Sequence, residues 1–243
     1  MLEIQNLEKS FGHKRAVRDI SFTLEPGVVL GFLGPNGAGK STTLRMIAGV
    51  LEPDSGDVKI AGHSITSDRR LAQKVLGYLP EGAPLYDDMR PPKFLEFIAS
   101  AHGLQGTAKK DAIERAIADA RIGGVCGQRI RSLSKGYRRR VGLAGAILHD
   151  PPVLILDEPT DGLDPNQKRS VSALIARLAP KKVIVISTHT LTDVPTMCTR
   201  ALVIDHGRVV ADETPDGLAK YADDGQLETA FNQLTNQAEV ISL

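Results

Sequence analysis

The stretch "GPNGAGKST", residues 34–42, fits the spacing Gly-x-x-x-x-Gly-Lys-Ser/Thr and follows the apolar run "VVLGFL". The residues after it, "GKSTTLRMIAGVL", have the composition of a helix, so the stretch joins a strand to a helix. Glycines let the backbone surround a phosphate with N–H groups, and the helix N-terminus adds a partial positive charge. The stretch therefore predicts a phosphate-binding loop, rather than a glycine-rich turn, within an α/β fold.

The side chains of this loop have distinct expected tasks. Lys40 is placed to reach the β- and γ-phosphates of a nucleotide, and the Ser41 hydroxyl is placed to ligate Mg²⁺. We expect the nucleotide to contact Gly34, Pro35, Asn36, Gly37, Ala38, Gly39, Lys40, Ser41 and Thr42.

Two adjacent carboxylates follow a second apolar run, "PVLILDEP", residues 152–159. Asp157 ends the run and is expected to hold Mg²⁺ through water. Glu158 comes next and is expected to accept a proton from an attacking water. A strand that ends in exposed acids would explain the pair in isolation, but beside a phosphate loop the pair indicates hydrolysis.

The pattern along the chain divides it into an α/β core, an insertion and a tail. The first third predicts strands at "LEIQNL", "DISFTL", "GVVLGFLG", "DVKIAG" and "VLGYLP". Three helical patterns follow, "PPKFLEFIASAHGL", "AKKDAIERAIADARI" and "YRRRVGLAGAILH". Then the strands "PVLILD" and "KKVIVIST" flank the helix "PNQKRSVSALIARLA", which is typical of a parallel sheet.

The end of the chain predicts two short strands in "ALVIDHGRVVAD", turning at His206 and Gly207, and a last helix in "DGQLETAFNQLTN". We therefore predict a single unit with an α/β core at 1–83 and 150–212, a helical subdomain at 84–149 and a short helical tail at 213–243.

Composition excludes several classes of protein. Thirty Lys and Arg residues stand against 29 Asp and Glu, a net charge of +1, which gives no overall attraction to nucleic acid or to an anionic membrane. Cys126 and Cys198 have no zinc or disulfide spacing, which fits a reducing compartment. The first residues lack the apolar core of a signal peptide, and no apolar run is long enough to cross a bilayer.

Three further motifs carry a resemblance to a known family. They are "LSKGY" at 133–137, "DGLD" at 161–164 and "STH", which ends at His189. In this order with the phosphate loop and Asp157, the sequence resembles the ATP-binding subunits of ABC (ATP-binding cassette) transporters. The resemblance implies the P-loop NTPase fold of ABC type, with an N-terminal antiparallel β portion and an inserted α-helical subdomain.

The resemblance assigns roles by position. "LSKGY" is similar to the family's signature loop, which serves the ATP of a partner subunit, so Ser134 and Gly136 would cap the γ-phosphate held by the partner's Lys40. His189 resembles the histidine that contacts the γ-phosphate and organises the catalytic glutamate. The remaining positions of the signature loop and the D-loop are Lys135, Tyr137 and Asp164.

Other residues keep two interpretations. Phe11 lies where family members stack an aromatic ring on adenine, although packing at a strand end would also explain it. Arg138, Arg139 and Arg140 fit either a solvated helix face or a nucleotide or interface role. Arg139 stands where many relatives have Gln.

The sequence departs from the family pattern at three positions. Glu81 replaces the usual Gln of the Q-loop; its carboxylate is expected to contact Mg²⁺ with Ser41 and Asp157. Lys135 and Tyr137 replace Gly and Gln of the signature. With "GYLPEGAPLYDDM" and "LETAFNQLT", these departures resemble exporters of the drug, polysaccharide and gliding-motility branch.

The resemblance implies an ATP-binding and ATP-hydrolysing subunit, with ATP and Mg²⁺ as cofactors, that powers a membrane transporter of export type. Its expected partners are a second copy or a homologous ATPase subunit, in a dimer that encloses two nucleotides, and an integral membrane permease, but no nucleic acid. We expect a cytoplasmic protein at the inner face of the cell membrane. The alternatives are a soluble ABC-type ATPase that acts on nucleic acid or ribosomes, and a non-hydrolysing nucleotide-binding module, against which Glu158 and His189 argue.

Overall fold

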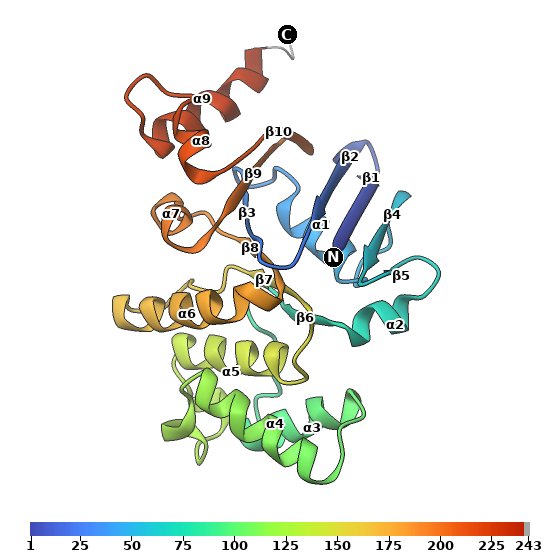
Figure 1. The fold of residues 1–243 in the computed structure, drawn as a ribbon, viewed down its shortest axis with the longest axis vertical. Helices are drawn as coiled ribbons and strands as arrows, with labels where there is room; N and C mark the ends of the chain where they lie inside the picture. Colours follow the sequence, from blue (N-terminus) through green and yellow to red (C-terminus); the bar gives the residue numbers. More distant parts are fainter. Residues whose placement is uncertain (241–243) are drawn as a thin grey trace.

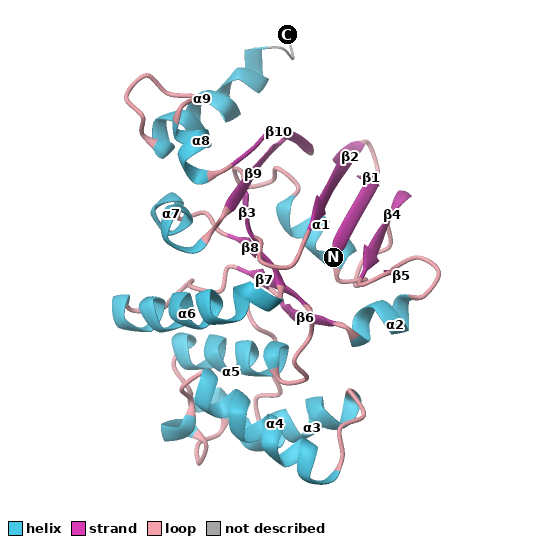
Figure 2. Ribbon diagram, viewed as in Figure 1, coloured by secondary structure: helices cyan, strands magenta, loops and turns pink. Residues whose placement is uncertain are grey.

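A computed structural model describes residues 1–240 of the chain, with side chains described through residue 235. Two β-sheets form the centre, and a separate group of helices lies at one end of the molecule (Figures 1 and 2). The C-terminal helices lie at the opposite end in the same view.

The first sheet is antiparallel, in the order β2-β1-β4-β5. Along the first strand every second or third side chain is apolar and buried, as at Leu2, Ile4 and Leu7, because one face of the sheet packs on the core. The strands are β1 (Leu2–Phe11), β2 (Lys14–Leu24), β4 (Ser55–Ile60) and β5 (His63–Ser64).

The second sheet has the order β10-β9-β3-β8-β7-β6 and is parallel except for β10, which pairs with β9 in antiparallel fashion. Every residue of β3, β7 and β8 is buried, because helices or the first sheet cover both faces, and this explains their unbroken apolar runs. The strands are β3 (Val29–Leu33), β6 (Leu76–Leu79), β7 (Val153–Asp157), β8 (Val183–Ser187), β9 (Arg200–Asp205) and β10 (Arg208–Glu213).

Two hydrophobic cores cover the faces of this second sheet. The first sheet and α1 (Lys40–Ile47) pack on one face, through Phe22, Phe32 and Leu44 among others. On the other face, α6 (Pro165–Leu178) and the apolar side of α5 (Lys135–Ile147) pack against β7 and β8. The remaining helices of the core and tail are α2 (Arg69–Lys74), α7 (Val194–Met197), α8 (Pro215–Ala219) and α9 (Leu227–Val240).

A third core belongs to the helices between β6 and β7. It joins α3 (Pro91–Ala101), α4 (Gly106–Asp119) and one side of α5 through buried residues such as Leu95, Ala116 and Val141. Figure 1 shows these helices together, away from the first sheet. The predicted α/β class with an antiparallel portion and inserted helices is confirmed.

The structure differs from the predicted elements in detail. The short helices α2 and α8 were not predicted, and α5 begins at Lys135, two residues before the expected start. The first inserted helix ends at Ala101, since Gly103 takes a left-handed conformation with φ +80°. The last three residues of the expected tail lie outside the described residues. No helix within residues 1–240 is long and apolar enough to cross a membrane.

Candidate active site

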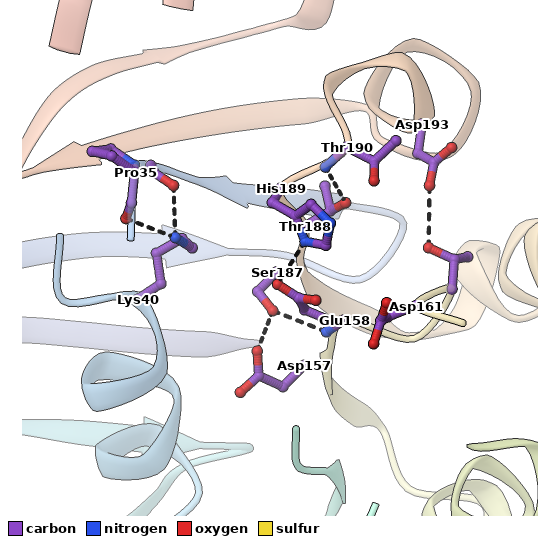
Figure 3. Close-up of polar contacts among 12 residues, drawn as sticks. Pro35, Lys40, Asp157, Glu158, Asp161, Ser187, Thr188, His189, Thr190 and Asp193 are labelled. Carbon is purple, nitrogen blue, oxygen red and sulfur yellow. Dashed lines mark hydrogen bonds and ion pairs between the residues drawn. The ribbon is translucent and has the colours of Figure 1, made fainter. Parts of the chain in front are cut away.

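The phosphate loop connects β3 to the first turn of α1, as its spacing predicts. Gly39 has φ +109°, and a β-carbon there would overlap the carbonyl oxygen of Ala16, so only glycine fits. Lys40 lies buried under the loop, and its Nζ donates to the carbonyl oxygens of Gly34 at 2.6 Å and Pro35 at 2.9 Å (Figure 3). The lysine thus bonds to the backbone of the loop in this structure.

Three carboxylates lie close enough to this ammonium group to affect its pKa. Burial lowers the pKa of Lys40, while the charges of Glu158, Asp157 and Glu81 oppose that shift. The ammonium group of Lys40 therefore adds positive charge between the phosphate loop and these carboxylates.

A cavity of about 250 Å³ lies over the loop and includes all of these groups. Phe11, at the end of β1, lines the same cavity with its side chain half exposed, as a platform for a base would be. Glu81, exposed in the turn after β6, closes another side. The cavity is lined by Phe11, Lys14, Ala16, Asn36, Gly37, Gly39, Lys40, Ser41, Thr42, Glu81, Asp157 and Glu158.

Asp157 is buried at the end of β7 and bonds to the neighbouring strand. The Ser187 hydroxyl, at the end of β8, donates to Oδ1 of Asp157 and accepts from the backbone N–H of Glu158 at 3.0 Å. Burial raises the pKa of Asp157, and the Ser187 hydrogen bond opposes that shift. Ser187 therefore holds both acids in place, a role that sequence reasoning missed although Ser187 lies in the predicted strand "KKVIVIST".

Glu158 and His189 form the next contact. Nδ1 of His189 lies 2.9 Å from Oε1 of Glu158, and the two side chains point toward one another (Figure 3). Glu158 has φ +52°, a conformation that favours glycine and turns its side chain out of the strand direction. Both residues also line a second, adjoining cavity of about 90 Å³ with Thr160 and Asp161.

The signature loop lies elsewhere. Ser134 is exposed and caps α5, where its hydroxyl accepts from the Tyr137 N–H at 3.4 Å. Nζ of Lys135 lies 2.7 Å from a carboxylate oxygen of Asp161 in the same chain. Gly136 is buried, and a β-carbon there would crowd Oε1 of Gln167. Among the residues the structure describes, none of these four lines the cavity over the phosphate loop.

Asp164 of the D-loop has a structural position. It is the N-cap of α6, and its Oδ1 accepts from the backbone N–H groups of Asn166 and Gln167, both at 2.9 Å. The carboxylate therefore stabilises the start of the helix.

The three arginines after the signature do not form a solvated helix face, which corrects one of the two interpretations. Arg139 and Arg140 are only 5% and 7% exposed, and Arg138 pairs with Asp87 at 2.6 Å. The guanidinium of Arg139 donates to backbone carbonyl oxygens at the ends of β6 and β7.

The residues over the loop offer hard oxygen donors, which Mg²⁺ prefers. The Ser41 hydroxyl and the carboxylates of Asp157 and Glu81 line one cavity, next to the lysine that would neutralise phosphate. This donor set fits a magnesium ion whose remaining ligands would be phosphate oxygens and water.

Comparisons with known proteins agree with this geometry. The family described as ABC transporter matches residues 17–161. A relative named "Nod factor export ATP-binding protein I", from Rhizobium sp. (strain N33), is 34% identical over 243 residues, which cover all of this chain and 79% of the relative.

Two solved structures share the fold. An ATP-binding subunit of an ABC transporter superposes with a TM-score of 0.87 at 27% identity, over 96% of this chain and 99% of that chain. A dimeric ATP-binding cassette in a post-hydrolysis state, bound to ADP and Pi, superposes with a TM-score of 0.81 at 22% identity, over 88% and 99%.

A phosphate loop shares one cavity with a buried aspartate and with the glutamate that directly follows this aspartate in the sequence. This combination defines a P-loop enzyme that hydrolyses nucleoside triphosphate. The chain belongs to the ABC transporter family, as an ATP-binding subunit that hydrolyses ATP.

Proposed function

We propose that two such subunits, identical or homologous, close head to tail over two ATP molecules and thereby drive a membrane permease that exports its substrate. The observation that carries this proposal is a separation within one chain. Lys40, Asp157, Glu158 and His189 gather around one site, while the exposed Ser134 caps a helix outside the cavity over the phosphate loop. A serine hydroxyl and free helix N–H groups suit a phosphate, so Ser134 serves the nucleotide of the partner subunit.

The roles in hydrolysis follow from the positions of the side chains. Lys40 leaves the carbonyl oxygens of the loop and stabilises the γ-phosphate oxygens as charge develops. Glu158 accepts the proton of the attacking water, and His189 holds the carboxylate in place through their 2.9 Å contact. Ser41, Asp157 and Glu81 hold Mg²⁺, which when bound neutralises charge on the β- and γ-phosphates.

Phe11 and the phosphate loop bind the nucleotide itself. The half-exposed ring of Phe11 stacks on adenine, and the loop surrounds the phosphates through residues 36, 37 and 39–42, which line the cavity. These contacts come from one chain, so a single subunit binds ATP before it closes on its partner.

The permease docks on an apolar groove between the core and the inserted helices. The groove has a volume of about 620 Å³ and is lined by the turn after β6 and by faces of α3 and α5. Tyr86 and Phe97, which line it, are 52% and 45% exposed and pack edge to face at 5.3 Å between ring centroids. Exposed aromatic rings around an apolar hollow are typical of a protein interface.

One segment of the chain connects the groove to the active site. Glu81 lines the cavity over the phosphate loop, and Ala83 to Tyr86, directly after it, line the groove. Movement of this turn with the nucleotide would pass to a docked subunit. The name of the Rhizobium relative supports export as the direction of transport, and a permease partner places the subunit at the cytoplasmic face of the membrane.

Size-exclusion chromatography with light scattering tests the closed dimer. Glu158→Gln slows hydrolysis, so with ATP and Mg²⁺ this variant should elute as a dimer and without ATP as a monomer. Adding Ser134→Arg places a long side chain where the protomers meet, and the double variant should stay monomeric while it still binds ATP. An ATP-dependent dimer of the double variant would contradict the proposal.

A further inference from the structure

The guanidinium of Arg139 connects three backbone carbonyl oxygens from two segments that lie far apart in the sequence, Pro80 and the adjacent pair Asp157 and Glu158. Its Nε donates to the carbonyl oxygen of Glu158 at 2.9 Å, and Nη2 donates to that of Asp157 at 2.8 Å and again to that of Glu158. Nη1 donates to the carbonyl oxygen of Pro80 at 3.2 Å. Arg139 is 5% exposed, and its side chain supplies these carbonyl groups with hydrogen-bond donors in a largely buried position.

The contact matters most for the backbone of Glu158. This residue has φ +52°, a conformation that non-glycine residues adopt only when their surroundings hold them there. Ser187 holds its N–H group, through the hydroxyl at 3.0 Å and the carbonyl at 3.2 Å, and Arg139 holds its carbonyl group. The direction of the Glu158 side chain therefore depends on both partners.

The other contacts extend this link to the rest of the site. Pro80 directly precedes Glu81, which lines the cavity over the phosphate loop, and Arg139 lies in α5 five residues after Ser134. One side chain thus joins the helix that begins at the signature loop to the ends of β6 and β7.

We propose that Arg139 is a positioning residue for hydrolysis, which fixes the backbone of Glu158 and makes the placement of its carboxylate depend on the position of the signature helix. The proposal rests on the proposed role of Glu158 as the general base. Arg139 does not line the nucleotide cavity, so it acts on turnover through Glu158 and leaves ATP binding unchanged.

The neighbouring Arg140 provides a matched comparison. It is also buried, at 7% exposure, and its Nη1 donates to the carbonyl oxygen of Arg121 at 3.1 Å. Its guanidinium stacks over Tyr137, 4.2 Å from the ring centroid. Arg140 therefore shares the residue type, the helix and the burial of Arg139, but its contacts stay within the inserted helical region.

Steady-state ATP hydrolysis by the full chain tests the proposal. Arg139→Met keeps an unbranched apolar side chain in place of the arginine stem and removes every side-chain donor, so kcat should fall about 10- to 100-fold with KM for ATP within about twofold. Arg140→Met should lower the melting temperature but keep kcat within about twofold. Arg139→Gln, which retains one amide donor, should recover part of the loss and guards against a Met variant that fails to fold.

Guanidinium ion provides a second readout. A cavity of about 180 Å³ borders Arg139 beside Gly82 and Asp161, so the ion can enter the space left by Arg139→Ala. Millimolar guanidinium, but not urea, should restore part of kcat in this variant and none in Arg140→Ala.

The possible outcomes distinguish the role of Arg139 from the role of Glu158 as the general base. Glu158→Gln with normal turnover would overturn the role of Glu158 itself. If Glu158→Gln loses turnover while Arg139→Met and Arg139→Gln keep it, only the role of Arg139 is overturned. Equal losses of kcat in folded Arg139→Met and Arg140→Met would likewise overturn it, because they would show a general effect of a buried arginine.

Discussion

Nδ1 of His189 lies 2.9 Å from Oε1 of Glu158, which joins the residue after β7 to the loop after β8. The His189 side chain is 59% exposed while that of Glu158 is 20% exposed, so the histidine approaches from the open side of the site. A bound γ-phosphate would meet the exposed ring first. Under the proposed function, the pair would link recognition of the phosphate to the direction of the carboxylate.

Lys40→Ala and Glu158→Gln should separate binding from chemistry. Without the ammonium group ATP should bind about tenfold more weakly or worse, since charge-assisted hydrogen bonds to phosphate are lost. The glutamine should leave ATP affinity unchanged and lower turnover about 10²- to 10⁴-fold. Titration calorimetry and phosphate release measure the two quantities. Equal loss of affinity in both variants would contradict the division of roles.

Phe11→Ala should weaken ATP binding about fivefold, because stacking on adenine contributes about 1 kcal/mol. Phe11→Tyr keeps the ring and serves as the control with normal affinity. Fluorescence titration with a labelled ATP measures both. Unchanged affinity in folded Phe11→Ala would mean that the ring only packs at the end of β1.

Local pattern was enough to predict the phosphate loop, the acids after β7 and most of the strands, because each depends on adjacent residues. The burial of Arg139 was beyond such reasoning, since its partners Pro80 and Glu158 lie 59 and 19 positions away. The short helix α2 was missed because six residues hold less than two turns of periodicity. The start of α5 was placed late because the Ser134 cap lies inside the signature motif.

A cysteine at Tyr86 should cross-link to the permease in membranes, because this side chain is exposed beside the apolar groove. A cysteine at Met89, which is three residues further along and partly buried against the inserted helices, should react more weakly. The experiment needs a background without Cys126 and Cys198. Glu228→Cys in α9 is the control, and cross-links from that helix in place of Tyr86 would disprove the proposed surface.

His149 should make stability depend on pH. Burial lowers the pKa of His149 from 6.5 to about 4, with a further contribution from the charge of His102, whose ring stacks on it at 3.6 Å. Between these pH values the unfolded chain binds more protons than the folded one, so the free energy of unfolding should fall as pH falls from 6.5 to 4.

Replacement of His149 by Gln should flatten this part of the pH profile, since Gln still offers a donor to the Leu76 carbonyl oxygen but does not titrate. Urea unfolding at several pH values measures the effect. The exposed His13→Gln serves as the control, and an unchanged slope in His149→Gln would contradict the prediction.

The site shared between two chains is the central claim, and mixing two inactive variants tests it most directly. Ser134→Ala removes the hydroxyl, is small enough for the protomers to close and leaves its own phosphate loop intact, and Lys40→Ala leaves its own signature loop intact. Each alone should show little ATP turnover, while Ser132→Ala, at an exposed serine just before the loop, should stay active.

In a mixed dimer, one site combines the intact Lys40 of the first chain with the intact Ser134 of the second. An equal mixture should therefore recover turnover, up to about a quarter of the wild-type rate if the chains pair at random. A mixture that stays at the sum of the two separate rates would contradict the account, because it would mean that Ser134 and Lys40 act within one chain.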